Sequence, residues 1–385
     1  MNRKTALIMA GVPATHASIF HRIRFSVLDQ VALIELPENS HRILILRDIE
    51  MERASQQARV STVHCPAEFT PADGLSGDRE TATAQAAAEC LRQDGVQVAI
   101  GDRSLPLIYV EMIRRAGIEM EYDADLGVKD RRQKDAEEVD HLRESQKVTE
   151  AAIEMACRTI ANASADAKGV LIHEGQALTS ERIRFAIDQF LSAREYTNPS
   201  SIIAGGPPAA DCHNFGSGEL RTGTPVIVDI FPTSRVTRYC GDCTRTVVHG
   251  DIPDEVIRMH TAVAAAKSAG IAATRSGVTG ESVHKATLAS IADSGYAIGL
   301  PTKDASDTYC GMTHGTGHGI GLEVHEPPLL DFKGPELLSG DALTIEPGLY
   351  CQAIGAVRLE DMVVVRDSGC ENLNVLPEDL DWSGA

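Results

Sequence analysis

The 385-residue sequence lacks any hydrophobic run long enough to cross a membrane. Its apolar stretches, such as 31–34 and 362–365, are far shorter than the roughly 18 residues that a membrane-spanning helix needs. Positive charge is also scarce, because 36 Lys and Arg stand against 55 Asp and Glu, for a formal net charge of −19. Such a surface repels phosphate backbones and anionic lipids, so we expect neither nucleic acid nor membrane as a partner.

A disulfide framework is also lacking. The nine cysteines are an odd number without regular spacing, which in a chain of this length is typical of reduced thiols and predicts a cytoplasmic location. Cys240 and Cys243 have the CxxC spacing of redox proteins, but such a motif opens a helix after a strand. Here β-favouring residues lie on both sides, so we interpret both as strand cysteines.

The composition is that of a globular protein, with 43% hydrophobic and 24% charged residues. At roughly 100–200 residues per domain, the length predicts two domains. In the first, strand patterns and helix-forming segments alternate, which predicts a small α/β domain over residues 1–130. The strands are expected at 31–36, 42–46 and 96–100, and the helices at 50–59 and 79–93. A charged stretch, 129–134, predicts the boundary.

The second domain is expected over residues 131–385. Apolar residues recur at helical spacing from about residue 135, and further helices are expected at 180–193, from 253 and at 280–292. Strands are expected at 343–345 and 362–365, bounded by Gly-containing turns. The fold class predicted for the whole chain is therefore α/β, of the α+β kind.

Three carboxylates interrupt apolar strands of this second domain. Asp229 lies within 226–231, Glu346 follows 343–345, and Glu360 precedes 362–364. A buried carboxylate is costly unless it is paired or bound to a metal. For Asp229 alone, a strand-end residue that accepts turn hydrogen bonds is an equally good interpretation. Three such carboxylates together favour a shared site.

Histidines cluster in the same half of the chain, at positions 314, 318 and 325. The intervening glycines exclude a helical zinc motif, and their spacing does not form a nucleotide-binding GxGxxG loop. If Asp229, Asp242, His318, Glu346 and Glu360 converge, they supply mostly oxygen ligands for two divalent ions that share bridging carboxylates. Two dications would balance the four carboxylates, and such a site would activate a bridging water.

These five residues, in their motifs, resemble the metal ligands of the pita-bread metallopeptidases, the family of methionine aminopeptidase, prolidase and aminopeptidase P. His318 stands in Gly-His-Gly-Ile-Gly-Leu-Glu-Val-His-Glu, Glu346 in Ile-Glu-Pro-Gly, and Glu360 in Arg-Leu-Glu-Asp. The resemblance covers residues from about 135 to about 370. It implies a small creatinase-type N-terminal domain followed by a pita-bread catalytic domain.

The resemblance also implies a role for each ligand. Asp229 would chelate one metal, Asp242 and Glu360 would bridge both, and His318 and Glu346 would complete the other. Glu346 would also be the general base for the metal-bound water.

Four further residues are implied as catalytic. His325 would contact the substrate near the scissile bond, and His213 is similar to an upstream histidine of the family, with an ordinary loop histidine as its alternative. His314 and Arg358 resemble the Xaa-Pro group within the family. Arg358 has an alternative role in holding Glu360 or Asp361, as Thr244 would hold Asp242.

The function implied is that of a dinuclear metallopeptidase that cleaves between an N-terminal residue and proline, in dipeptides or longer peptides, by attack of a metal-bridging water. Oxygen-rich ligation favours manganese over cobalt, zinc or iron, and the family leads us to expect a homodimer. The alternative is a hydrolase or lyase that acts on a small amide, cyclic amidine or sulfonium compound. One departure is that Asp229 and Asp242 lie 13 residues apart, about two more than usual, so a longer hairpin would alter access.

Overall fold

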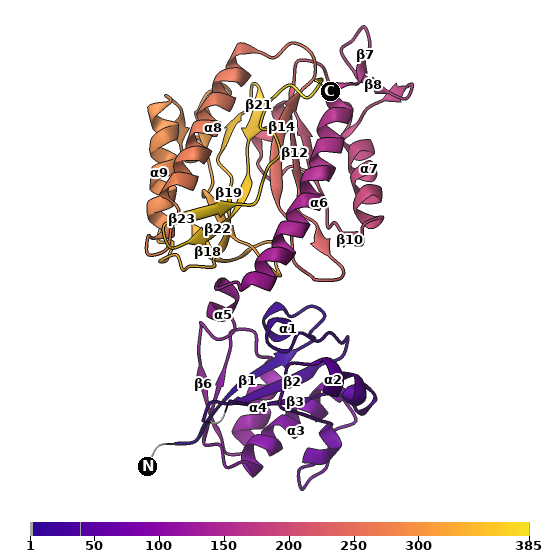
Figure 1. The fold of residues 1–385 in the computed structure, drawn as a ribbon, viewed down its shortest axis with the longest axis vertical. Coiled ribbons are helices and arrows are strands. Elements are labelled where there is room, and N and C mark those ends of the chain that lie inside the picture. Colours follow the sequence, from indigo (N-terminus) through magenta and orange to yellow (C-terminus); the bar gives the residue numbers. More distant parts are fainter. Residues whose placement is uncertain (1–2, 39, 385) are drawn as a thin grey trace. The chain divides into compact units, whose positions relative to one another are not determined.

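A computed structural model of the chain describes residues 3–38 and 40–384. It divides into two compact units, Met1–Arg131 and Arg132–Ala385, each drawn in Figure 1. Within the described residues, no helix is long and apolar enough to cross a membrane. Each unit has hydrophobic core clusters of its own.

The N-terminal unit is built around a six-stranded sheet in the order β4-β3-β2-β1-β5-β6. Its strands are β1 (Thr5–Gly11), β2 (Val31–Leu36), β3 (His41–Ile45), β4 (Thr62–His64), β5 (Val98–Gly101) and β6 (Glu119–Tyr122). Its helices are α1 (Ala17–Ile23), α2 (Met51–Gln57), α3 (Arg79–Gln93) and α4 (Leu107–Arg115), with 3-10 turns at Asp48–Glu50 and Pro66–Phe69. The strands expected at 31–36 and 42–46 correspond to β2 and β3, which pair antiparallel as a hairpin.

Helices cover both faces of this sheet, which explains why its central strands are mostly apolar. Successive side chains of a strand point to opposite faces. Ile8 and Ile34 accordingly pack in one cluster with residues of α3 and α4. Met9 and Leu33 pack in another cluster with residues of α1 and α2.

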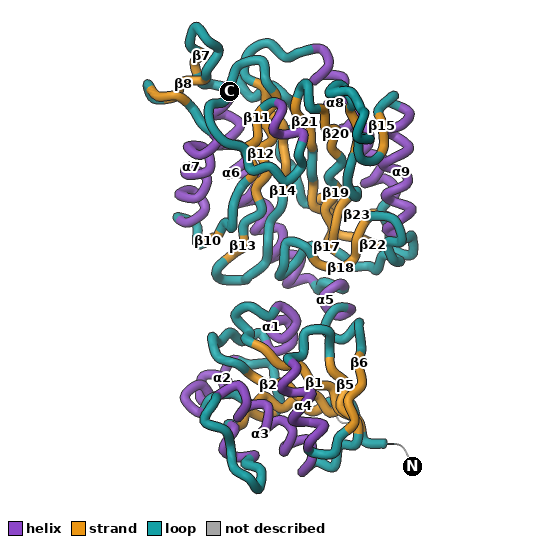
Figure 2. The backbone as a smooth tube through the Cα atoms, turned by 180° about the vertical axis from the view of Figure 1, so that it is seen from behind, coloured by secondary structure: helices purple, strands orange, loops and turns teal. Residues whose placement is uncertain are grey.

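The described residues of the C-terminal unit form two pairs of long helices, preceded by the short helix α5. The helices are α5 (Lys129–Arg132, which crosses the division), α6 (Ala136–Ala161), α7 (Ser180–Ser192), α8 (Asp254–Ala273) and α9 (Gly280–Asp293), with a 3-10 turn at Pro207–Ala210. Helix α6 begins with a capping box, in which Asp135 and Glu138 each bond the other's backbone N–H. Figure 1 shows α6 and α7 on one side of the strands and α8 and α9 on the other, and Figure 2 shows the same from behind.

The strands between these helices form three main sheets. Their orders are β11-β12-β14, β15-β16-β20-β21 and β18-β17-β19-β22-β23. The strands are β11 (Ile202–Gly205), β12 (Pro225–Ile230), β14 (Cys243–Val248), β15 (Ala297–Ile298), β16 (Cys310–Met312), β17 (Gly317–Gly319), β18 (Glu326–Leu330), β19 (Ala342–Ile345), β20 (Gly348–Cys351), β21 (Gly355–Arg358), β22 (Asp361–Arg366) and β23 (Gly369–Asn372). Smaller sheets pair β7 (Ser164–Ala165), β8 (Leu171–His173) and β9 (Gln176–Ala177), and β10 (Tyr196–Thr197) with β13 (Thr233–Ser234).

The long connection between Asp229 and Asp242 forms a folded loop. Its β13 pairs with β10, and Thr233 forms a β-bridge with Cys240. The β12–β14 register stays regular and places Asp229 opposite Thr244. Cys243 begins β14, so no helix follows the CxxC pair, and both cysteines are buried and outside any disulfide.

Candidate metal centre

One cavity of about 400 Å³ in the C-terminal unit gathers the site residues predicted from the sequence. All nine of them line it: His213, Asp229, Asp242, His314, His318, His325, Glu346, Arg358 and Glu360. They come from separate segments between residues 213 and 360, mostly at strand ends. The fold therefore brings together side chains that the sequence distributes over nearly 150 residues.

Three of these residues form the tightest group. Asp242, His318 and Glu360 are buried, and each offers one ligand atom within 4.8 Å of the others. His318 Nε2 lies 3.8 Å from Asp242 Oδ2 and 3.5 Å from Glu346 Oε1. Asp229 and Glu346 line the same cavity but lie outside this tightest group.

The backbone around Asp242 is fixed by helix α6. The side-chain amide of Gln146 accepts from the Asp242 N–H at 3.0 Å and donates to its carbonyl at 2.7 Å. Gly241, the preceding residue, lies against the same helix, where an added Cβ would be 2.1 Å from Thr149 Oγ1. Neither Gln146 nor Gly241 was identified from the sequence. For Gln146 the reason is that a polar residue on an amphipathic helix is expected to face solvent.

The ring of His318 is oriented by its neighbour. Its Nδ1 lies 3.1 Å from the carbonyl oxygen of Gly319, and a carbonyl can only accept, so Nδ1 carries the proton. Nε2 is then the unprotonated nitrogen that faces the carboxylates. Burial, and next the nearby His325, lower the pKa of His318 to about 4. The imidazole is thus neutral near pH 7, which is the form that binds metals.

Strand β14 positions Glu360. The Thr244 hydroxyl donates to Glu360 Oε2 at 2.7 Å, and the Glu360 N–H donates to the Thr244 carbonyl at 3.1 Å. Thr244 was expected to hold Asp242, but its hydroxyl bonds Glu360 instead. The reason is that the backbone of Glu360 lies beside β14 and bonds to Thr244 itself.

Arg358 pairs with a different carboxylate from those proposed as its alternative partners. Its NH2 lies 2.6 Å from Asp229 Oδ2, and its NH1 donates to the Tyr350 hydroxyl at 3.0 Å. Asp361, by contrast, is held by two other cations. The alternative in which Arg358 holds Glu360 or Asp361 is therefore replaced by a direct pair with Asp229.

His314 has both ring nitrogens engaged. Nδ1 lies 2.8 Å from the Gly315 carbonyl and Nε2 lies 2.7 Å from the Tyr350 hydroxyl. Burial, and next the charge of Arg358, lower the pKa of His314 to about 4, so the ring is neutral. Nδ1 then donates and Nε2 accepts from Tyr350, which itself accepts from Arg358. Sequence reasoning missed Tyr350, which joins the two predicted residues.

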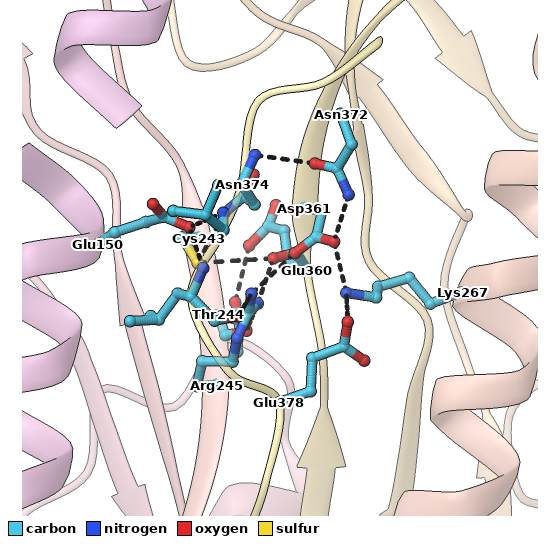
Figure 3. Close-up of polar contacts among 12 residues, drawn as sticks. Glu150, Cys243, Thr244, Arg245, Lys267, Glu360, Asp361, Asn372, Asn374 and Glu378 are labelled. Carbon is cyan, nitrogen blue, oxygen red and sulfur yellow. Dashed lines mark hydrogen bonds and ion pairs between the residues drawn. The ribbon is translucent and has the colours of Figure 1, made fainter. Parts of the chain in front are cut away.

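A second polar layer, also missed, lies behind Glu360 (Figure 3). Arg245 is 1% exposed, and its NH1 donates to the Glu360 carbonyl at 2.7 Å. Its NH2 lies 2.9 Å from Asp361 Oδ1, while Lys267 Nζ of helix α8 lies 2.6 Å from Asp361 Oδ2. Arg245 and Lys267 thus hold Asp361, the residue next to the predicted ligand Glu360. The only signal of this layer in the sequence is Arg245, a charged residue inside an apolar strand.

Comparison with known proteins agrees with this geometry. Residues 140–367 match the profile of metallopeptidase family M24. The chain belongs to this family. The resemblance predicted from the sequence motifs is thereby confirmed.

The relatives of this M24 protein named next among curated sequences match slightly less than half of it. It is 33% identical over 181 residues to the uncharacterized peptidase YqhT of Bacillus subtilis, covering 46% of this chain and 47% of YqhT. It is 36% identical over 182 residues to the probable dipeptidase PepE of Mycobacterium tuberculosis (strain H37Rv), covering 46% and 45%. The chain thus spans about half the length of these curated relatives.

Solved structures match the M24 protein along nearly its whole length. Dipeptidase PepE from Mycobacterium ulcerans has a TM-score of 0.75 at 25% identity, covering 98% of this chain and 92% of that one. The Xaa-Pro dipeptidase from Bacillus anthracis has a TM-score of 0.78 at 24% identity, covering 97% and 94%. Prolidase from Pyrococcus horikoshii scores 0.77 at 21% identity, covering 98% and 95%. The predicted fold class, a mixed α/β protein with the pita-bread fold of prolidases, is confirmed.

The donor set fits the divalent metal that membership of M24 implies. Burial raises the pKa values of Asp242 and Glu360 well above normal, and repulsion between the carboxylates adds to the effect. Burial also raises the pKa of Glu346 to about 7. Asp229 Oδ1 is buried and accepts no hydrogen bond among the described residues. Bound cations would reverse these shifts and provide the partner that Asp229 Oδ1 needs.

Proposed function

We propose that this M24 protein is a dinuclear metal-dependent peptidase that cleaves the bond between an N-terminal residue and a following proline. The observation that carries the proposal is the convergence of four carboxylates, three of them buried and Glu346 partly exposed, with a neutral imidazole in one cavity. The name of a further relative, the Xaa-Pro dipeptidase of Pyrococcus furiosus, which is 29% identical over 182 residues, supports the specificity for proline.

The ligands proposed for two ions are Asp229, Asp242, His318, Glu346 and Glu360. When bound, two divalent ions would acidify a water molecule and stabilise negative charge on the substrate carbonyl. The oxygen-rich ligand set favours manganese. The Thr244 hydroxyl and the Gln146 amide would keep Glu360 and Asp242 in place while the ions bind.

Proton transfer is assigned to Glu346 and substrate contact to His325. Glu346 lies in the cavity with Oε1 3.5 Å from His318 Nε2, where its carboxylate would accept the proton of the attacking water. The His325 ring lines the cavity, 4.2 Å from the His318 ring between centroids, where it would contact the scissile peptide. His213 is exposed at the cavity rim, in keeping with a substrate contact.

Arg358 and His314 are proposed to act through other residues. Arg358 holds Asp229 Oδ2, and His314 fixes the Tyr350 hydroxyl that accepts from Arg358. Because both nitrogens of His314 are engaged, it positions Arg358 rather than the substrate. The chain of bonds therefore orients Asp229, a proposed ligand.

The test begins with protein stripped of metal, reloaded with manganese, and assayed for proline-specific cleavage beside a chelated control. Changing His318 or Glu360 to Ala should abolish both bound metal and turnover. Changing His325 to Ala should lower turnover while metal content, measured by elemental analysis, stays at the wild-type level. A His318→Ala protein with full metal content and activity would refute the ligand assignment.

The same assay distinguishes the second candidate, a hydrolase or lyase for small non-peptide compounds. Two bound metals per chain without any cleavage of Xaa-Pro peptides would favour that candidate. Three further expectations stay predictions: a creatinase-type domain over residues 1–130, a homodimer and a cytoplasmic location.

A further inference from the structure

The cavity contains more than the proposed metal ligands and the histidines. Its wall includes apolar side chains from both sides of the site, namely Ile202, Phe215, Phe231, Val324 and Leu329. An apolar wall suits a proline ring and the side chain before it. It does not select the group that comes after proline in the substrate. That selection depends on the charged groups, because a dipeptide ends in a carboxylate immediately after proline whereas a longer peptide continues with a neutral amide.

Among the described residues, the cavity wall offers no accessible Lys or Arg side chain to receive such a carboxylate. Within residues 3–38 and 40–384, the only Lys or Arg that lines it is Arg358. Four of its five N–H groups are engaged, because NH2 bonds Asp229, NH1 bonds Tyr350 and the Cys212 carbonyl, and Nε bonds Thr244. Arg358 is also buried beneath the pocket surface. The imidazoles of His213 and His325 donate equally well to a carboxylate or to a peptide carbonyl, so they do not favour the dipeptide.

The cavity does offer one carboxylate outside the proposed ligand set. Asp331 lines it just beyond β18, and its side chain is 45% exposed. Oδ1 accepts from the Phe332 N–H at 2.6 Å and lies 3.4 Å from His284 Nε2. Burial lowers the pKa of His284, so this imidazole leaves the charge of Asp331 uncompensated. Lys285, on the same helix as His284, is paired with Glu281 at 2.6 Å instead.

We infer, on the basis of the proposed function, that the enzyme cleaves Xaa-Pro bonds in peptides of three or more residues and that Asp331 discriminates against the free carboxylate of Xaa-Pro dipeptides. A negative group at the cavity wall repels a substrate carboxylate, and no accessible Lys or Arg among the described lining residues offsets this repulsion. A peptide that continues beyond proline presents a neutral amide and avoids the repulsion. Asp331 is thus a specificity-determining residue rather than a catalytic one.

The matched test uses three substrates with the same first residue: Ala-Pro, its amide Ala-Pro-NH₂, and Ala-Pro-Ala. The amide has nearly the size of the dipeptide but lacks the carboxylate, so it isolates charge from length. We expect kcat/KM to be higher for the amide and the tripeptide than for the dipeptide. Asp331→Asn should raise the dipeptide-to-amide ratio of kcat/KM about fivefold, the effect of one partly screened charge pair, and Asp331→Lys should raise it further.

Asp293→Asn, at the exposed end of α9, is the matched control and should keep the wild-type ratio. Circular dichroism and metal content would verify that each variant is folded and loaded. A wild-type preference for the dipeptide over the amide would overturn the inference while leaving the proposed peptidase function standing. An unchanged ratio in Asp331→Lys would overturn the role of Asp331. Absence of cleavage of all three substrates would instead refute the proposed function.

Discussion

Replacing Lys267 with Met tests whether the buried charges behind Glu360 stabilise the C-terminal unit. Lys267 Nζ lies 2.6 Å from Asp361 Oδ2 and 2.8 Å from Glu378 Oε1, and its side chain is 2% exposed. Methionine has a similar length and no charge, so the substitution removes the cation without opening a large cavity. Asp361, 3% exposed, would remain in the interior with one partner fewer.

The expected loss depends on the partners that Asp361 retains. Removing one member of a buried ion pair costs about 3–5 kcal/mol when the other is left alone. Asp361 keeps Arg245 at 2.9 Å and the Asn372 amide at 2.9 Å. We therefore expect a decrease of about 2–3 kcal/mol in the free energy of unfolding, below the full value. Glu378→Gln removes the other partner of Lys267, but Glu378 is 41% exposed, so that loss should stay below about 1 kcal/mol.

Urea unfolding followed by tryptophan fluorescence gives the measurement. The single tryptophan, Trp382, is 5% exposed in a core cluster of the C-terminal unit, so its emission reports on that unit alone. A chelator in all samples removes any contribution from metal binding. If Lys267→Met lowered the free energy of unfolding no more than Glu378→Gln does, the reasoning would be refuted. The cost of burying Lys267 and Asp361 would then equal the stabilisation that their ion pair provides.

Three further outcomes are expected. Gly241→Ala should destabilise the C-terminal unit by about 2 kcal/mol or more, because its Cβ would lie 2.1 Å from Thr149 Oγ1, whereas Gly369→Ala, with nothing within 4 Å, should change little in the same fluorescence assay. Tyr109→Phe should be neutral or stabilising by up to about 1 kcal/mol in thermal unfolding, since the buried hydroxyl has no hydrogen-bond partner among the described residues; a clear loss would contradict this. Manganese at 100 times its Kd should stabilise the wild type by about 2.7 kcal/mol and leave His318→Ala unaffected; equal stabilisation of both would contradict the proposed ligand set.

The gathering of the site residues could be predicted because they break a local pattern. Asp229 lies within an apolar strand, and Glu346 and Glu360 lie directly beside apolar strands, where burial of a carboxylate without a partner is costly. Each anomaly is visible in a window of a few residues. The helices could also be predicted from short windows, and α7 and α9 begin and end within a few residues of the expected positions. Local sequence patterns therefore indicate which residues belong to the site and where the helices lie.

The partners of these residues could not be predicted, because they depend on distances across the fold. Arg245 reaches Asp361, 116 residues away, and Gln146 reaches Asp242, 96 residues away. In helix α6, Gln146 belongs to the buried face, together with apolar residues such as Leu142 and Ile153. A hydrophobic periodicity assigns such a polar residue to the solvent side. Only the position of the strands reveals that it holds the backbone of a proposed ligand.

The charged stretch 129–134 shows how the same local pattern has two physical outcomes. A run of charges between domains is usually solvated, and the stretch does contain the division between the units, at Arg131 and Arg132. Yet Lys134 Nζ lies 2.5 Å from Glu326 Oε1, with side chains 2% and 3% exposed. Because Glu326 begins β18 and directly follows His325, the beginning of the C-terminal unit is bonded to the residue next to a proposed substrate contact. A charge in a boundary segment can therefore position a residue of the site, which neither composition nor periodicity indicates.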